Sequence, residues 1–360
     1  MVWQSFKQLA LGLLLITFSA GVLLLSDWNR RISPNEGLSK ETLLSTHTAR
    51  LNLLYYIDAP AFEEARDGML AGLKEAGLVK DKDFTIVVRN SQGDMATANS
   101  MIDLAVTEET DLIMTLSTPM LQAAIHRAGN IPIVFSLVAN PILAGAGRSN
   151  EHHRPNVTGV YTTSDFDGMM TVLPQFLPHA RRVGTLFAPA EINSVFYKDA
   201  LTEAARKVGI EVIGVGIGST ADVADGVLAL ISKDLDAICQ ISDNLTSASF
   251  VSILRAAKKA RLPLFGFQSS QARDGAIAVI ARDFEDAGRE AAFLAARILR
   301  GESPRSIPFQ PIKKSRLIIN LDAAQAINLN VPLTLMEKAD SVIGHHSWKS
   351  SNNAFPKALN

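Results

Sequence analysis

LNLLYYI, at residues 51–57, is the first of four short apolar runs that decide the fold of the first half of the chain. The other three are FTIVVR at 84–89, DLIMTLS at 111–117 and IPIVFSLV at 131–138. Their apolar residues hardly alternate with polar ones, which is typical of parallel strands covered on both faces. Between the runs, apolar residues recur at helical spacing in residues 62–77, 94–108 and 119–129. The pattern predicts parallel strands connected by helices.

The same order returns in the second half of the chain. Short apolar runs lie at 182–188 (RVGTLFA), 210–217, 235–242 (LDAICQIS) and 262–267 (LPLFGF), with amphipathic segments between them at 194–209, 221–233 and 246–260. Each parallel connection must be right-handed and must cover the sheet with its helix. We therefore predict an α/β protein with two doubly wound, Rossmann-like lobes.

Composition excludes several classes of function. The chain has 360 residues, of which 47% are hydrophobic and 20% charged, and this length favours roughly two domains. With 35 basic and 36 acidic residues, the formal charge is −1, so we expect no polybasic surface for nucleic acid. The single cysteine, Cys239, lies inside a predicted strand, where a buried and inert thiol is expected. One cysteine forms neither an intramolecular disulfide nor a cysteine-based zinc site.

The amino terminus predicts a location outside the cytoplasm. Residues 9–25 (LALGLLLITFSAGVLLL) carry no charge, and as a hydrophobic helix these 17 residues would span about 26 Å, near the lower limit for crossing a bilayer. This length favours an uncleaved anchor in the inner membrane. The alternative is a signal peptide cleaved near Thr17-Phe18-Ser19, which would leave the protein free in the periplasm. Residues 1–28 are thus an anchor or signal, residues 29–48 a polar linker, and residues 341–360 a flexible tail.

The segments that follow the predicted strands are mostly polar in both halves, and ligands bind at the carboxyl ends of strands in open α/β sheets. We take the following residues from these segments as candidate ligand-binding residues: Ala59, Ser117, Thr118, Asn140, Glu191, Asn193, Ser194, Asp243, Asn244 and Gln268. The alternative for each polar one is simple capping of the next helix, which favours the same residue types. Polar residues at the facing edges of two similar lobes favour ligand binding over helix capping. Capping alone does not require a second, similar lobe.

Two carboxylates, Asp243 and Glu191, are the most informative of these candidates. In a dehydrated cleft they would accept hydrogen bonds from a ligand ammonium group, and Asn193, Ser194 and Asn244 would supply further hydrogen bonds. Phe135, Phe187 or Phe267 would form an apolar wall, although core packing is the default role for phenylalanines in strands.

Enzyme motifs are missing from the sequence. Residues 214–218 (GVGIG) are rich in glycine but lie on the second strand of their lobe and lack a Walker lysine, so we interpret them as strand and turn. No G-x-S-x-G motif supplies a nucleophilic serine, and no carboxylate pattern completes a metal site with the histidine pairs 152–153 and 345–346. We expect no enzymatic activity, no cofactor and no metal.

Eight motifs occur in an order that resembles a known family. They are DAPAFEEARDGMLAGLKEAG at 58–77, NSQGD at 90–94, LSTPMLQAA at 116–124, IPIVFSLVANP at 131–141, NVTGV at 156–160, APAEINS at 188–194, ISDN at 241–244 and ARILRGESP at 296–304. Together, over residues 50–332, the chain resembles the periplasmic substrate-binding proteins of ABC transporters, in the branch with tryptophan- and tyrosine-binding members. The resemblance implies a class I binding-protein fold, in which several strands join two lobes that close on a ligand.

The resemblance also implies how the chain is divided and which residues face the ligand. The strand near 276–281 would return to lobe 1, the helix near 284–300 would pack there, and residues 307–320 would cross back. Lobe 1 would then comprise residues 49–164 plus 276–303, and lobe 2 residues 165–275 plus 304–340. The motif matches add Asn156 to the candidates and assign Asp243 to a ligand cation. The family often has an aspartate where this chain has Asn140, which removes one negative charge.

We therefore predict the solute-binding component of an ABC importer, which captures a small polar or zwitterionic, amino-acid-like ligand. Its partners would be the permease and ATPase subunits, and residues 9–25 would contact the membrane. A ligand-sensing extracytoplasmic module of a signalling system is the first alternative. A small-molecule enzyme on the same two lobes is the second, since fold alone does not define function.

Overall fold

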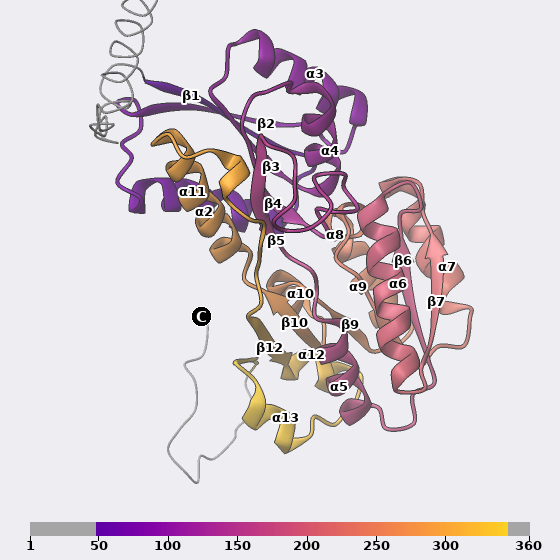
Figure 1. Ribbon diagram of the computed structural model, residues 1–360. Helices are drawn as coiled ribbons and strands as arrows, with labels where there is room; N and C mark the ends of the chain where they lie inside the picture. The colour runs from indigo at the N-terminus through magenta and orange to yellow at the C-terminus, as the bar shows by residue number, and fades with distance from the viewer. Residues whose placement is uncertain (1–47, 345–360) are drawn as a thin grey trace, which may run out of the picture. The chain divides into compact units, whose positions relative to one another are not determined.

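The computed structural model describes residues 48–344 (Figure 1). The predicted hydrophobic helix at 9–25, nearly all of the linker at 29–48 and residues 345–360 of the predicted tail lie outside this range. Among the described residues, every helix is too short or too polar to cross a lipid bilayer.

Five strands from the first half of the chain and β11 from near its end build a sheet of six parallel strands in the order β11-β5-β4-β3-β1-β2. Its strands are β1 (Ala49–Tyr55), β2 (Phe84–Asn90), β3 (Leu112–Leu116), β4 (Ile133–Val138), β5 (Val157–Tyr161) and β11 (Gln310–Pro311). Four helices pack on it: α2 (Pro60–Glu75) and α11 (Phe284–Leu299) lie together, as do α3 (Met95–Thr107) and α4 (Thr118–Arg127) (Figure 1). We call this part lobe 1.

The second half builds a sheet of seven strands in the order β13-β12-β10-β9-β8-β6-β7. These strands are β6 (Arg182–Phe187), β7 (Glu211–Gly216), β8 (Ala237–Cys239), β9 (Leu264–Gly266), β10 (Ala278–Arg282), β12 (Ser315–Asn320) and β13 (Ser341–Ile343). Only β12 runs antiparallel to its neighbour β10 among these pairs. The helices are α5 (Phe166–Phe176), α6 (Ile192–Lys207), α7 (Val223–Ile231), α8 (Asn244–Ala248), α9 (Phe250–Lys259), α10 (Ser269–Asp274), α12 (Leu321–Ala326) and α13 (Leu333–Lys338). We call this part lobe 2, and the prediction of two parallel-sheet α/β lobes is confirmed.

Three boundaries differ from those predicted. Residues 276–281 were expected in lobe 1, but β10 pairs with β9 and β12 in lobe 2, because the short α10 connection keeps it next to β9. Residues 304–311 were expected in lobe 2, but β11 pairs with β5 in lobe 1 and Thr158 Oγ1 donates a 2.8 Å hydrogen bond to the carbonyl of Ile307. Residues 341–343 belong to β13, which pairs with β12, so they are not part of a tail.

The chain crosses between the lobes three times, at residues 162–165, 282–283 and 312–314. The Arg282 guanidinium joins all three crossings. Its Nε donates to the carbonyl of Thr163 at 2.8 Å, and its Nη1 donates to Ser315 Oγ at 2.8 Å and to the carbonyl of Lys313. Ser315 Oγ in turn donates to Asp165 Oδ2 at 2.8 Å, so the three crossings form one hydrogen-bonded hinge.

Helix α11 is held in lobe 1 by a close backbone contact with α2. A Cβ placed on Gly68 would lie 2.0 Å from the carbonyl oxygen of Glu285, and one placed on Gly288 would lie 2.0 Å from the carbonyl oxygen of Ala65. The backbones of α2 and α11 therefore come into contact at these two glycines, which have no side chains. This contact holds α11, the helix that follows the second crossing, against lobe 1.

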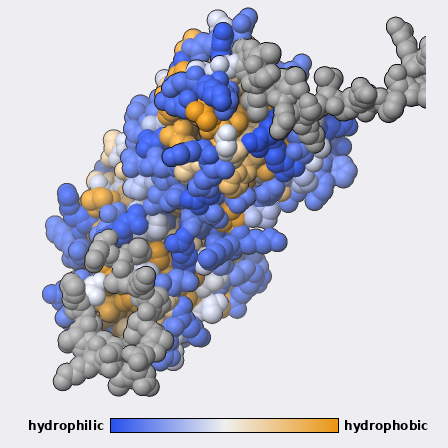
Figure 2. Space-filling view, turned by 90° about the vertical axis from the view of Figure 1, so that its left-hand side faces the viewer, coloured by the Kyte–Doolittle hydropathy of each residue, from blue (hydrophilic) through white to orange (hydrophobic). Residues whose placement is uncertain are grey.

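The surface is largely polar. Large apolar side chains that are exposed occur in both lobes, among them Val79, Leu228 and Leu333. On the face shown in Figure 2, apolar patches are separated from one another by hydrophilic residues. Small, dispersed apolar patches are typical of a surface in contact with water.

The substitution Gly288→Ala tests the contact between α2 and α11. Helix propensity alone would favour alanine by about 1 kcal/mol, but the added methyl group meets the Ala65 carbonyl, so we expect the free energy of unfolding to fall by about 2–3 kcal/mol. Urea unfolding followed by circular dichroism measures this change. Glu290→Ala, on the same helix, is the control and should change stability by about 1 kcal/mol or less. A stabilised Gly288→Ala protein would contradict the contact.

Candidate functional site

A small cavity lies between the carboxyl ends of the two sheets. Its volume is about 30 Å³, and residues of both lobes line it: Ala61, Phe62, Leu137, Thr162 and Phe284 from lobe 1 and its crossings, and Tyr197, Ser242, Asp243, Asn244, Ser247 and Gln268 from lobe 2. Three of the predicted residues, Asp243, Asn244 and Gln268, are among them. The cavity has room for about two water molecules.

Asp243 is buried and fully hydrogen-bonded. It precedes α8, and its Oδ1 accepts hydrogen bonds from Thr246 N at 2.7 Å and Thr246 Oγ1 at 2.5 Å. Its Oδ2 accepts hydrogen bonds from Ser194 Oγ and, at 3.3 Å, from Ala188 N. Burial raises the pKa of this carboxyl, while the four donated hydrogen bonds oppose the shift. Asp243 therefore joins the start of α8 to the end of β6 and to α6, and its acceptor positions are occupied by the protein itself.

Glu191 is arranged differently, although it also begins a helix. It precedes α6, and one of its oxygens, Oε2, accepts hydrogen bonds from Asn244 Nδ2 at 2.6 Å and Asn193 Nδ2 at 3.2 Å. Burial and the negative charge of Asp243 raise the pKa of Glu191 to about 7, and the two amide donors oppose this shift. Glu191 is thus a carboxyl group that changes its charge near neutral pH.

Glu191 lies near lobe 1 as well as lobe 2. Tyr56 follows β1 in lobe 1 and is 7% exposed. Burial raises the pKa of Tyr56 to about 12, with smaller contributions from the charges of Glu191 and Asp94. The carboxyl group is therefore close enough to affect a side chain across the cleft.

Aromatic side chains build the apolar part of this region. Phe166 makes edge contacts with Tyr197 and Phe267, with ring centroids 5.7 and 4.8 Å apart. The Tyr197 hydroxyl donates a 2.9 Å hydrogen bond to the carbonyl of Thr162, at the first crossing. Phe62 on α2 lines the cavity from the other lobe. Of the phenylalanines proposed as an apolar wall, Phe135 instead packs against Phe309 in the core of lobe 1, with centroids 5.1 Å apart.

The candidates in lobe 1 act as caps and turns. Ser117 has a φ of +100° and accepts a 3.2 Å hydrogen bond from Met120 N, so it caps α4. Thr118 Oγ1 accepts a 3.3 Å hydrogen bond from Ala139 N, and Asn140 Oδ1 accepts from two amides of the turn that follows it, at 3.0 and 3.1 Å. Ala59 precedes α2. These residues lie at the carboxyl ends of the strands, as predicted, but their polar side chains already have partners.

Asn156 does not lie at the cleft. It precedes β5, at the amino end of the strand, and its Nδ2 donates to the carbonyls of Gly129 and Ile131, both at 3.0 Å. Because parallel strands place their amino and carboxyl ends at opposite edges, Asn156 supports the sheet from the far side. The motif match predicted its role wrongly.

Several cleft residues were missed by the sequence analysis: Tyr56, Phe62, Thr162, Tyr197 and Ser242. Tyr56 follows β1 directly and Ser242 comes shortly after β8, so both positions were available as a signal, whereas Tyr197 lies within α6 and had none. Within residues 48–344, the buried atoms Asn193 Oδ1 and Ser242 Oγ have no hydrogen-bond partner. Such groups are costly to bury unless something else satisfies them.

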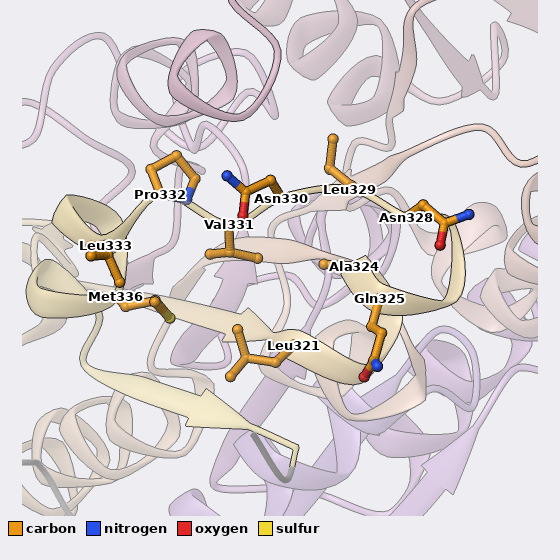
Figure 3. A pocket seen from close by; sticks show the side chains of 10 residues that line it. All are labelled: Leu321, Ala324, Gln325, Asn328, Leu329, Asn330, Val331, Pro332, Leu333 and Met336. Carbon is orange, nitrogen blue, oxygen red and sulfur yellow. The ribbon is translucent and has the colours of Figure 1, made fainter. Parts of the chain in front are cut away.

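A larger hollow, of about 700 Å³, lies in lobe 2 alone (Figure 3). Leu321, Leu329, Val331 and Met336 are among the apolar residues that line it, and the amides of Gln325, Asn328 and Asn330 lie at its edge. None of the predicted ligand-binding residues lines this hollow. Because all of its lining residues belong to lobe 2, closure of the two lobes would not change its shape. The described residues also hold no cluster of three or more metal-ligating side chains.

A family model described as "ABC transporter substrate binding protein" matches residues 50–343. The chain belongs to this family. Members bind the substrates of ABC transporters outside the cytoplasm and are not enzymes, so a small-molecule ligand and permease and ATPase partners follow from membership.

Three relatives give the range of similarity. The tyrosine-binding protein of Clostridioides difficile is 27% identical over 316 residues, which are 88% of this chain and 91% of the relative. A conserved domain protein from Vibrio cholerae has a solved structure with a TM-score of 0.80 and 30% identity, covering 82% of this chain and all of the other. The ABC domain from Streptococcus pneumoniae, solved in complex with L-Trp, has the same TM-score and coverage at 24% identity.

The raised pKa of Glu191 predicts how stability depends on pH. Folding favours the protonated carboxyl, so this contribution is complete below the unfolded pKa of about 4.3 and is lost as the pH rises to about 7. The loss amounts to about 4 kcal/mol. We expect Glu191→Gln to remove this pH dependence in denaturation experiments between pH 4.5 and 7.5. Parallel curves for the variant and the natural protein would show that Glu191 is not shifted.

Proposed function

We propose that this protein binds an amino acid with an aromatic side chain and delivers it to an importing ABC transporter. One observation carries the ligand class: a half-buried carboxyl group, Glu191, is hydrogen-bonded to Asn244, which lines a cleft with aromatic residues from both lobes. An ammonium group is the natural partner for this carboxyl. The tyrosine-binding relative supports the aromatic side chain.

Glu191 rather than Asp243 is our choice for the ammonium partner. Asp243 already accepts four hydrogen bonds from the protein, two on each oxygen. Glu191 accepts its two on a single oxygen, which leaves Oε1 for a ligand. Asp243 then acts by holding the start of α6 beside α8, and Asn193 and Asn244 hold the Glu191 carboxylate toward the cleft.

Ligand enclosure follows from the size of the cavity. A volume of about 30 Å³ is far too small for an amino acid, so the lobes must separate before a ligand enters. The hinge at the three crossings permits such a motion, and the contacts from both lobes then favour the closed form when ligand is present.

The membrane attachment is a further part of this proposal. We propose that residues 9–25 remain as an uncleaved helix and tether the protein to the inner membrane. Intact-mass measurement and membrane fractionation of the natural protein test this: the full mass in the membrane fraction is expected. A mass that lacks the first 19 or so residues, with the protein in the periplasmic extract, would support cleavage instead.

Calorimetric titration with L-tyrosine and L-tryptophan tests the ligand class. We expect binding that strengthens as the pH rises from 5.5 to 8, because an ammonium group pairs with ionised Glu191 and binding at neutral pH releases a proton. Glu191→Gln should weaken affinity roughly tenfold to a hundredfold and abolish the pH dependence.

The matched control is Glu203→Gln, which makes the same chemical change on the exposed face of α6. It should leave affinity unchanged. Failure of both amino acids to bind at any pH would overturn the ligand class. Binding that Glu191→Gln leaves intact would overturn only the assignment of the carboxyl group.

A further inference from the structure

A second set of contacts joins the lobes at the edge of the cleft, away from the hinge. Glu64 lies on α2 of lobe 1, and Ser269 and Arg273 lie on α10 of lobe 2. Ser269 Oγ donates to the two Glu64 carboxylate oxygens at 3.1 and 3.3 Å, and Arg273 Nη2 donates to Oε1 at 3.0 Å. Ser269 and Arg273 are four residues apart in a helix, so both side chains face the same carboxylate.

These three residues do not line the cavity, but their neighbours do. Phe62, two residues before Glu64, and Gln268, immediately before Ser269, both belong to the cavity wall. The segments around Phe62 and Gln268 therefore enclose the cavity, and the same two segments make the contact between Glu64 and α10 just outside the cavity.

We propose that Glu64, Ser269 and Arg273 form an interlobe latch that favours the closed form and thereby sets ligand affinity and release without touching the ligand. The contacts exist only when α2 and α10 meet. In a separated form the Glu64 carboxylate and the Arg273 guanidinium are hydrated, so the latch has a different free energy in the two forms. A group with such a difference shifts the equilibrium between them, and apparent affinity follows the fraction of protein able to close.

The expected size of the effect is modest. The Arg273 side chain is 56% exposed and that of Glu64 is 27% exposed, and ion pairs at such positions contribute little. The hydroxyl contacts of Ser269 add to the ion pair. We expect loss of the latch to weaken affinity by about threefold to tenfold for every ligand of the site.

The test measures the distance between lobes in the full-length chain without ligand. Ser100→Cys on α3 and Thr202→Cys on α6 place exposed labelling sites in the two lobes, while the natural Cys239 is buried and stays unlabelled. We expect Glu64→Gln and Arg273→Gln each to shift the distance distribution toward larger values. The charge-exchanged pair Glu64→Lys with Arg273→Glu should restore the short distances, which a merely destabilised protein would not do.

Glu63→Gln is the matched control, because Glu63 is the exposed neighbour of Glu64 on α2. An unchanged distribution in Glu64→Gln, or an equal shift in Glu63→Gln, would overturn the latch. The latch rests on the proposed function only for its effect on affinity, which is measured with L-tyrosine as the probe. If L-tyrosine does not bind, the proposed ligand class is wrong. The distances measured without ligand still test the latch in that case.

Discussion

The guanidinium of Arg282 is bonded to each of the three segments that pass between the lobes. It sits at the end of β10, where the second crossing begins, and it contacts the carbonyls of Thr163 and Lys313 and the hydroxyl of Ser315. A charged donor in a partly buried position makes stronger hydrogen bonds than a neutral one. The three crossings are therefore joined at one point, which is where the hinge of the proposed closure lies.

This constraint explains why cleft residues from distant parts of the chain meet at all. Phe62, Thr162 and Asp243 come from distant parts of the chain, and they line one cavity because the crossings place the two lobes side by side. Near this cavity, burial separates the roles of two similar carboxyl groups. Asp243 is stabilised by four hydrogen bonds from the protein and serves the framework. Glu191 has fewer donors, and burial together with the charge of Asp243 raises its pKa to about 7.

Sequence patterning was sufficient for the lobes but for only a part of the cleft, since three of the predicted residues line the cavity. The strands from residue 51 to residue 138 and from 182 to 267 were predicted because buried parallel strands have a distinctive apolar run. The crossings between the lobes were harder to predict. The apolar sequence of β10 would suit a strand of either lobe, and only its pairing with β9 and β12 assigns it to lobe 2. Asn156 shows the same limit for a site: its motif was matched, but a motif does not reveal which end of a strand carries it. Tyr197 was missed because a helical residue nearly two turns after the cap has no pattern of its own.

The closed cleft also separates two sources of binding free energy. In the function proposed above, contacts between Glu191 and a ligand distinguish one ligand from another, because they depend on the ligand's charge and shape. Contacts between the lobes, such as those of Glu64 with α10, are the same for every ligand and change only the fraction of protein that is closed. A protein that delivers its ligand must also release it, so closure that is too favourable would slow release. A weak, solvent-exposed ion pair meets this requirement better than a buried one, because its free energy is small and it is readily replaced by water.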